Sequence, residues 1–228
     1  YTTDPNLIKS AKKINKISYE EMLEMASLGA KIMQPASIQE ARLNRIEIDV
    51  RSTFSKVKGT TITKKKNIFS RNTIRGISFT KNDAKLTLIG VKDKPGVAAS
   101  IFRPLYENSI NVDMVVQNIS ANRRETDLTF TIKLEDLIKT RRLIENNKSI
   151  KFKKLIINKN VSKVSIIGVG MITTPGVTYR MFKALAKKKI NIEVISTSEI
   201  KISVLINKKN LKKSVEILHQ EFKLSNSL

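Results

Sequence analysis

Two stretches of this 228-residue sequence read alike: LIGVKDKPGVA at residues 88–98 and IIGVGMITTPGVT at residues 166–178. In both, an apolar run ends in Ile-Gly-Val, and a short loop then closes with Pro-Gly-Val. Further along the chain, Ile110-Asn111-Val112 recurs as Ile190-Asn191-Ile192. Matching residues lie about 80 positions apart, which indicates a domain duplication because this period is too long for a solenoid repeat.

Both copies predict the same order of elements. In the first copy, residues 84–158, we expect the order βαββαβ, at 86–91, 98–105, 112–119, 128–134, 136–146 and 151–157. In the second copy, residues 161–228, we expect the order βαββα, at 164–169, 177–188, 192–197, 200–206 and 211–222. The pattern predicts an α+β protein with two tandem ferredoxin-like modules.

Two features interrupt the regularity of the repeat. The second copy lacks a final strand, whereas residues 73–80 have strand character and belong to neither copy. We predict that this early strand, over residues 73–79, completes the second module's sheet, because that sheet otherwise keeps an open apolar edge. Pro104 lies inside the first helix of the first module, where it costs up to about 3 kcal/mol unless the helix bends.

The first 55 residues predict a helix, a second helix and a strand. Ser18 and Glu21 form a capping-box pattern, and Pro35 ends the first helix and opens the second. The expected buried positions are Met22, Ala26, Ala30 and Met33 on the first helix, and Ile46, Ile48 and Val50 on the strand. These elements are too few for a domain, so we expect residues 1–55 to be the end of an α/β domain.

Residues 56–72 are polar and lack apolar periodicity, so we expect a linker there. The chain starts at Tyr1 rather than Met, which leads us to expect a piece of a longer polypeptide. No secretion signal opens the sequence, and no apolar run approaches the ~20 residues that span a bilayer. We therefore expect a cytoplasmic protein without a membrane partner.

The formal net charge is +23, from 43 Lys and Arg against 20 Asp and Glu. Such a charge suits a nucleic-acid-binding protein. However, the densest Lys runs, at 64–66 and 187–189, are short and fall in a loop and at a helix C-terminus, where the helix dipole favours cations without any partner. We interpret the lysines as solvated surface and expect no nucleic-acid partner.

Metal chemistry is not expected either. The sequence has no Cys and a single His, His219, which we expect to be exposed on a Lys-rich helix. Gly168 and Gly170 form a Gly-x-Gly pair after a strand, but Thr173 replaces the third glycine of a dinucleotide fingerprint. An RNA-recognition module is also disfavoured, because Phe130 is the only aromatic residue on the expected central strands of the two modules.

The duplicated Pro-Gly loops are the candidate binding sites. Gly96 and Gly176 allow the backbone to approach a ligand closely, and N–H groups at a helix N-terminus attract a carboxylate. Asp93, in the first loop, suits the ammonium group of an amino acid, and Asn111 and Gln117 offer further polar contacts. A Pro-Gly pair can also simply begin a helix, but its recurrence in both copies favours binding.

Five segments resemble a known family. Residues 88–98 and 111–118 resemble the first ACT domain of bacterial aspartate kinases, and residues 195–204 resemble the second. Residues 1–5 and 24–31 are similar to the last part of the amino-acid kinase domain of the same enzymes. The resemblance covers essentially the whole chain.

The resemblance implies two sets of site residues. Nucleotide contacts fall on Tyr1, Asn6 and Lys31, although the family usually has Arg at the position of Asn6. Effector contacts in the first module fall on Asp93, Lys94, Pro95, Gly96, Val97, Ala98, Asn111, Val112, Asp113 and Gln117. Those in the second module fall on Val177, Thr178, Asn191, Ile192, Ser198 and Glu199.

The resemblance also implies a reaction, the transfer of the ATP γ-phosphate to the side-chain carboxylate of L-aspartate, with Mg²⁺ beside ATP. That step opens the route to lysine, threonine and methionine. The family segments that hold the ATP phosphates and aspartate are absent from this sequence, so it contains no catalytic residue and we expect the chain alone to be inactive.

Regulation is the role that the resemblance assigns to this chain. Lysine or threonine is the expected effector, and pairing of the ACT modules is expected to make the protein a homo-oligomer. The alternative is a free-standing ACT-type regulatory subunit without kinase activity, against which residues 1–55 argue.

Overall fold

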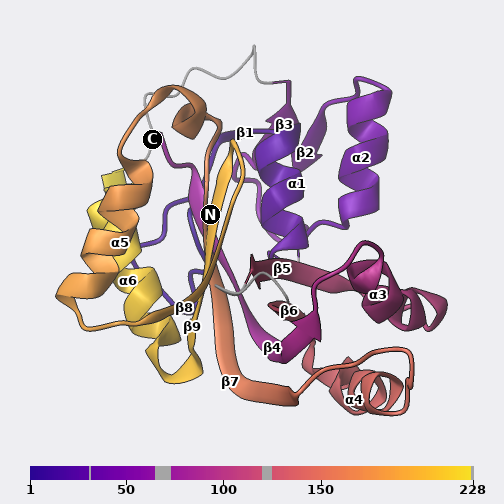
Figure 1. Ribbon diagram of the computed structural model, residues 1–228. Coiled ribbons are helices and arrows are strands. Elements are labelled where there is room, and N and C mark those ends of the chain that lie inside the picture. Colours follow the sequence, from indigo (N-terminus) through magenta and orange to yellow (C-terminus); the bar gives the residue numbers. More distant parts are fainter. Residues whose placement is uncertain (31, 65–72, 120–124, 227–228) are drawn as a thin grey trace. The chain divides into compact units, whose positions relative to one another are not determined.

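The computed structural model describes residues 1–30, 32–64, 73–119 and 125–226 (Figure 1). The chain forms two compact units. The composite unit contains residues 1–80 and 163–228, and the inserted unit contains residues 81–162. The fold is of the mixed α+β class predicted from the sequence, with β4 (Gly76–Lys92) and β7 (Lys154–Ile167) as its longest strands.

The inserted unit holds the first ferredoxin-like module. Its strands follow the order β5 (Val112–Ile119), β6 (Glu125–Lys133), β4 and β7. β6 pairs antiparallel with both β5 and β4, and Lys153 N donates to Ile89 O at 2.8 Å where β4 meets the start of β7. The helices are α3 (Val97–Glu107) and α4 (Leu137–Glu145), with the short 3-10 turn η2 (Leu134–Asp136) before α4.

Alternating side chains build the core of this module. Leu86 and Leu88 of β4 are fully buried together with Phe130 of β6, and the rings of Phe102 and Phe130 pack edge to face at 5.3 Å. Pro104 does lie inside α3, as predicted, and Asn108 Nδ2 donates to the Pro104 carbonyl at 2.9 Å. The helix therefore continues past the proline to its C-cap at Asn108.

The composite unit holds the second module. It comprises β8 (Ile192–Thr197), β9 (Lys201–Asn207), α5 (Val177–Lys187) and α6 (Leu211–Glu221), with 3-10 turns at Val169–Thr173, Lys208–Asn210 and Leu224–Asn226. Figure 1 shows α5 and α6 side by side against the strands.

The early strand completes the sheet of the second module, as predicted. Arg75 N donates to Ile167 O at 2.7 Å, so the chain entering β4 pairs with the end of β7, and the strand order continues through β9 to β8. The strands predicted at 73–79 and 86–91 are, however, one continuous strand, β4, and those predicted at 151–157 and 164–169 are one continuous strand, β7. No Gly or Pro interrupts residues 77–89 or 154–167, so nothing in either segment ends a strand.

The segment before the modules is a small α/β layer of the composite unit. It contains β1 (Lys16–Ser18), α1 (Tyr19–Ser27), α2 (Pro35–Leu43), β2 (Ile48–Val50) and β3 (Thr60–Thr63). The strand order is β1-β3-β2, with β3 parallel to β1 and antiparallel to β2. The Ser18–Glu21 capping box and the helix start at Pro35 are confirmed.

Three details of this segment differ from the sequence prediction. β3 lies within the expected linker, because its β-branched run Thr-Thr-Ile-Thr fits a strand and Ile62 is fully buried. Residues 65–72 of that linker are outside the described residues. The first helix ends at Ser27 and not at Pro35, so Ala30 and Met33 lie beyond it. Met25 and Leu28 are buried on and after α1, whereas the predicted stripe of Met22, Ala26, Ala30 and Met33 is half-buried. Ile46 precedes β2 and is 59% exposed.

His219 is the clearest correction. It was expected at the surface, but it is fully buried on α6. Its Nε2 lies 2.9 Å from Thr2 Oγ1, and Ile8 joins the same core cluster as Leu218. The N-terminal segment therefore covers a second side of α6, a contact across more than two hundred residues that helix periodicity does not reveal.

Candidate functional site

An open pocket lies at the start of α3 in the inserted unit. Its volume is about 440 Å³, within the ~300–1,000 Å³ typical of small-molecule sites. Its lining consists of Asp93, Lys94, Pro95, Gly96, Val97, Ala98 and Gln117. All of these residues belong to the predicted effector set, so the structure brings the loop and the β5 residue Gln117 together around one cavity.

The loop takes its shape from Gly96. This residue is the N-cap of α3 at φ 85°, in the left-handed region that favours glycine. A Cβ there would meet nothing within 4 Å, so the backbone is open on that side. The first N–H groups of a helix have no acceptor within the helix, and the helix dipole adds positive potential there. The pocket therefore offers an anion site next to the half-buried Asp93.

Asp127 on β6 supports the strand end that leads into this loop. Its Oδ1 accepts a hydrogen bond from Gly90 N at 2.9 Å. Gly90 has φ 67°, and the register between β4 and β6 shifts between Leu88 and Val91. The carboxylate thus holds a bulge just ahead of the pocket. The sequence prediction did not include Asp127, and only its place on a strand beside the Ile-Gly-Val motif hints at this role.

Three predicted effector residues of the first module do not line this pocket. Asn111 and Asp113 are exposed near the start of β5. Val112 is half-buried and packs against the core of the module.

The second module repeats the backbone of the loop. Gly176 also has φ 85° and is the N-cap of α5. Val177 is 4% exposed and belongs to the core, and Ile192 packs against that core. The predicted residues at the surface are Thr178, Asn191, Ser198 and Glu199.

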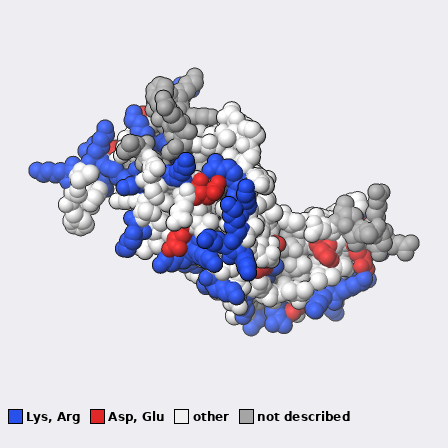
Figure 2. Space-filling model, turned by 90° about the vertical axis from the view of Figure 1, so that its left-hand side faces the viewer, with Lys and Arg blue, Asp and Glu red and all other residues white. Residues whose placement is uncertain are grey.

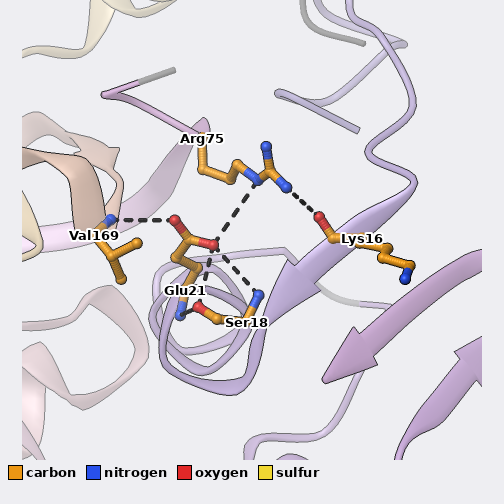
Figure 3. Close-up of polar contacts among 5 residues, drawn as sticks. All are labelled: Lys16, Ser18, Glu21, Arg75 and Val169. Atoms are coloured by element: carbon orange, nitrogen blue, oxygen red, sulfur yellow. Dashed lines mark hydrogen bonds and ion pairs between the residues drawn. The ribbon is translucent and has the colours of Figure 1, made fainter. Parts of the chain in front are cut away.

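The first turn of the second module is held by a buried carboxylate from α1. Glu21 Oε1 accepts a hydrogen bond from Val169 N at 3.1 Å (Figure 3). The glycines on either side of Val169 both lie close to Thr73. A Cβ added at Gly168 would lie 2.3 Å from the carbonyl oxygen of Thr73, and a Cβ added at Gly170 would lie 2.7 Å from the Cα of Thr73. Close packing thus accounts for the Gly-x-Gly pair without a dinucleotide.

The predicted nucleotide residues fall in the composite unit. Tyr1 is 51% exposed, and Asn6 is exposed with its backbone N–H donating to Asp4 Oδ1 at 2.9 Å. Lys31 lies outside the described residues. Thr2, between Tyr1 and Asn6, is firmly held: its carbonyl accepts from Ile77 N at 2.7 Å, and its hydroxyl contacts buried His219.

Burial has a measurable consequence at His219, because it lowers the pKa of the imidazole below its usual value. Neither His219 nor Glu21 was predicted to act beyond its own helix. The Ser-x-x-Glu pattern identified Glu21 as a helix cap but did not indicate that its other carboxylate oxygen binds Val169 N. Nothing in the sequence around His219 indicated its contact with Thr2.

Many Lys and Arg side chains lie on the surface. Figure 2 shows Lys and Arg side chains across the visible face, with Asp and Glu between them. Some cations are paired, such as Arg180, whose Nε lies 2.9 Å from Glu221 Oε1. Within the described part of the chain, no helix is long and apolar enough to cross a membrane, and no group of three or more His, Cys, Asp or Glu side chains could hold a metal ion.

Comparison with known proteins places these features in a family. The family model described as "ACT domain" matches residues 86–147 and 164–222. The model described as "Amino acid kinase family" matches residues 1–52. The matched segments therefore coincide with the two modules and the segment before them.

Individual relatives agree. An aspartate kinase of Pseudomonas fluorescens is 43% identical over 226 residues, covering 98% of this chain and 54% of the relative. The regulatory subunit of Thermus thermophilus aspartate kinase is 34% identical, with a TM-score of 0.62, covering 66% of this chain and 99% of that one. Clostridium acetobutylicum aspartate kinase shares the fold, with a TM-score of 0.87 at 24% identity, covering 97% of this chain and 51% of that one.

The chain thus spans about half the length of the curated relatives it matches. Its paired ACT modules, the kinase-family segment before them and the identity along almost its whole length agree with one another. The chain belongs to the aspartate kinase family.

Proposed function

We propose that this chain is the C-terminal, effector-sensing portion of an aspartate kinase. The pocket at the start of α3 carries the proposal, because its lining consists entirely of residues that the resemblance assigns to the effector. In the whole protein, a side-chain carboxylate oxygen of L-aspartate attacks the γ-phosphorus of ATP. The bond to the β,γ-bridging oxygen breaks, and ADP leaves as the aspartyl phosphate forms.

A free amino acid fits the chemistry of the pocket. Its carboxylate would accept from the first N–H groups of α3 beside Gly96, and its ammonium group would pair with Asp93. Its side chain would then lie toward Gln117. Lysine or threonine are the proposed effectors. Either regulates the kinase only if it binds the active and less active arrangements with different affinity.

The nucleotide would contact this chain at Tyr1, Asn6 and Lys31. The half-exposed Tyr1 beside the anchored Thr2 suits a fixed contact with a bound nucleotide. As the resemblance implies, we place Mg²⁺ beside the phosphates of ATP. Asn6 offers a neutral amide where the family usually has a cation, so a weaker phosphate contact is expected there.

A free-standing regulatory subunit is the second candidate. It is favoured by the Thermus thermophilus regulatory subunit, 99% of whose length matches this chain. The match of residues 1–52 to the amino acid kinase family argues for a kinase domain in the same polypeptide. Aspartate phosphorylation by the complete protein, and none by residues 1–228 alone, would support the kinase.

We also propose that the protein is a cytoplasmic homo-oligomer. β5 ends the strand order in the inserted unit and β8 ends it in the composite unit. Each of these edge strands exposes an apolar side chain at the same place in the repeat, Val115 at 48% and Ile195 at 44%. An edge strand with exposed apolar residues favours pairing with another chain.

The test of the sensing role is a thermal-unfolding titration of this chain with L-lysine, L-threonine and L-methionine. A ligand present at 100 times its dissociation constant stabilises a protein by about 2.7 kcal/mol. We expect lysine or threonine to raise the unfolding temperature and Asp93→Asn to abolish the rise. Glu135→Gln, which neutralises an exposed carboxylate outside the pocket lining, is the matched control. The proposal fails if none of the three amino acids shifts the transition.

A further inference from the structure

Helix α1 is tied to the second module by two carboxylates one turn apart. Glu21 is 3% exposed, and its Oε1 accepts from Val169 N (Figure 3). Glu24 Oε2 lies 2.9 Å from the ammonium group of Lys201, with both side chains about a quarter exposed. Both contacts lie within the composite unit, and both partners stand directly beside turns of the second module.

The contact at Glu21 is fixed by further bonds. Its Oε2 accepts from Ser18 N at 3.3 Å and from Ser18 Oγ at 3.1 Å, and Arg75 Nε lies 3.9 Å away (Figure 3). The Arg75 guanidinium also donates to the Lys16 carbonyl. Burial lowers the pKa of Arg75, and the charge of Glu21 opposes that effect. A buried, multiply bonded ion pair of this kind resists displacement, so Glu21 is the fixed end of α1.

Both contact points of the second module adjoin predicted effector residues. Ser198 and Glu199 form the turn between β8 and β9, closed by Ser198 N donating to Lys201 O at 2.8 Å. The next residue, Ile200, accepts a hydrogen bond from Gly168 N at 3.0 Å, and Gly168 precedes Val169. A shift of this turn is therefore passed to Lys201 along the chain, whereas Val169 is held in place by the buried Glu21.

The other end of α1 leads to the predicted nucleotide contact. The helix ends at its C-cap Leu28, and Ala30 N donates to Met25 O at 2.9 Å. Gly29, at φ 113°, lies so close to β4 that a Cβ would be 2.3 Å from Phe79 O. The next residue after Ala30 is Lys31. A small displacement of α1 is therefore passed on as far as Ala30, the residue before Lys31.

We propose that α1 is the element that couples the second module to the nucleotide segment, with Glu24 and Lys201 as positioning residues and Glu21 as the pivot. An amino acid bound at the turn of Ser198 and Glu199 changes the Glu24–Lys201 contact and swings α1 about Glu21. This inference rests on the proposed function, because it needs an effector that alters nucleotide binding.

The experiment uses the complete kinase polypeptide that contains this chain. Calorimetry gives the dissociation constant of a non-hydrolysable ATP analogue without and with saturating L-lysine, and separately with L-threonine. The ratio of the two constants is the coupling factor, which is about 5–150 in typical allosteric proteins. Glu24→Lys and Lys201→Glu are each expected to lower the coupling factor at least about fivefold. If the coupling factor of the unmodified kinase is below about five, each variant is expected to lower it to 1. The double exchange is expected to restore it to within about twofold.

A matched ion pair on the same helix serves as the control. Glu20, in the first turn of α1, lies 3.5 Å from Arg42 of α2, so it joins α1 to the small α/β layer and not to the second module. Glu20→Lys, Arg42→Glu and their double exchange should leave the coupling factor unchanged. The milder Glu24→Gln replaces Glu24→Lys if the charge reversal prevents folding.

The outcomes separate the two proposals. If the unmodified kinase binds neither amino acid, the proposed function fails and this inference fails with it. If it binds one without any change in nucleotide affinity, only this inference is overturned. If the unmodified kinase is regulated but the Glu24 and Lys201 variants keep its coupling factor, only this inference is overturned. It is overturned as well if the double exchange restores nothing, or if the Glu20–Arg42 variants lose coupling equally.

Discussion

Individual buried or half-buried polar residues decide much of the behaviour expected of this chain. His219, Glu21 and Asp127 each bond a backbone or side-chain group far away in the sequence. None of these hydrogen bonds has a local sequence pattern, because each joins two elements that are far apart along the chain. The effector loop is different, since its pattern recurs in both copies and could be found from the sequence alone.

The buried imidazole of His219 predicts a pH-dependent stability. Its pKa is lowered in the folded protein, so the unfolded chain binds its proton first as the pH falls. The stability contribution is therefore complete above the ordinary His pKa of ~6.5 and is lost on acidification below it, by at most about 1.4 kcal/mol at pH 5.5. Thermal unfolding between pH 7.5 and 5.5 measures the loss.

His219→Gln is the control for this prediction, because the chain has no other histidine. The variant is expected to be less stable than the parent at pH 7.5 and to show a smaller decrease between pH 7.5 and 5.5. An equal decrease in parent and variant would assign the pH dependence to other groups.

At the scale of elements, the helices and strands of both modules follow from apolar spacing and the Pro-Gly loops. β3 was missed because four residues in a polar stretch carry too little pattern, although Ile62 is fully buried. The fusion of strands into β4 and β7 was missed because a half-polar stretch without Gly or Pro reads equally well as a loop or as a continuing strand.

Two glycines of the repeat predict opposite costs. At Gly96 an added Cβ meets no atom within 4 Å, so Gly96→Ala carries only the strain of φ 85°, about 1–2 kcal/mol. At Gly168 the backbone is extended but a Cβ would lie 2.3 Å from Thr73 O. Gly168→Ala is therefore expected to cost more than Gly96→Ala, at about 3 kcal/mol. Urea unfolding of the two variants ranks them, and the reverse order would contradict the packing role of Gly168.

At the scale of the whole molecule, the edge strands predict self-association. Val115→Lys on β5 and Ile195→Lys on β8 place a charge on an exposed apolar edge. At least one of them is expected to shift the protein toward monomer in sedimentation velocity. Ile138→Lys, at a 68% exposed position on α4, is the matched control and should not change the sedimentation coefficient. Unchanged association in both edge variants would place the contact elsewhere.

The continuity of β4 also restricts how this family member can vary. Ile77, an odd-numbered residue of β4, packs in the core of the composite unit. The even-numbered residues Ala84, Leu86 and Leu88 pack in the core of the inserted unit. Because side chains alternate along a strand, inserting or deleting a single residue between Ile77 and Ala84 would expose one of these two sets to water. Insertions or deletions of two residues in this interval should therefore be tolerated better than those of one residue.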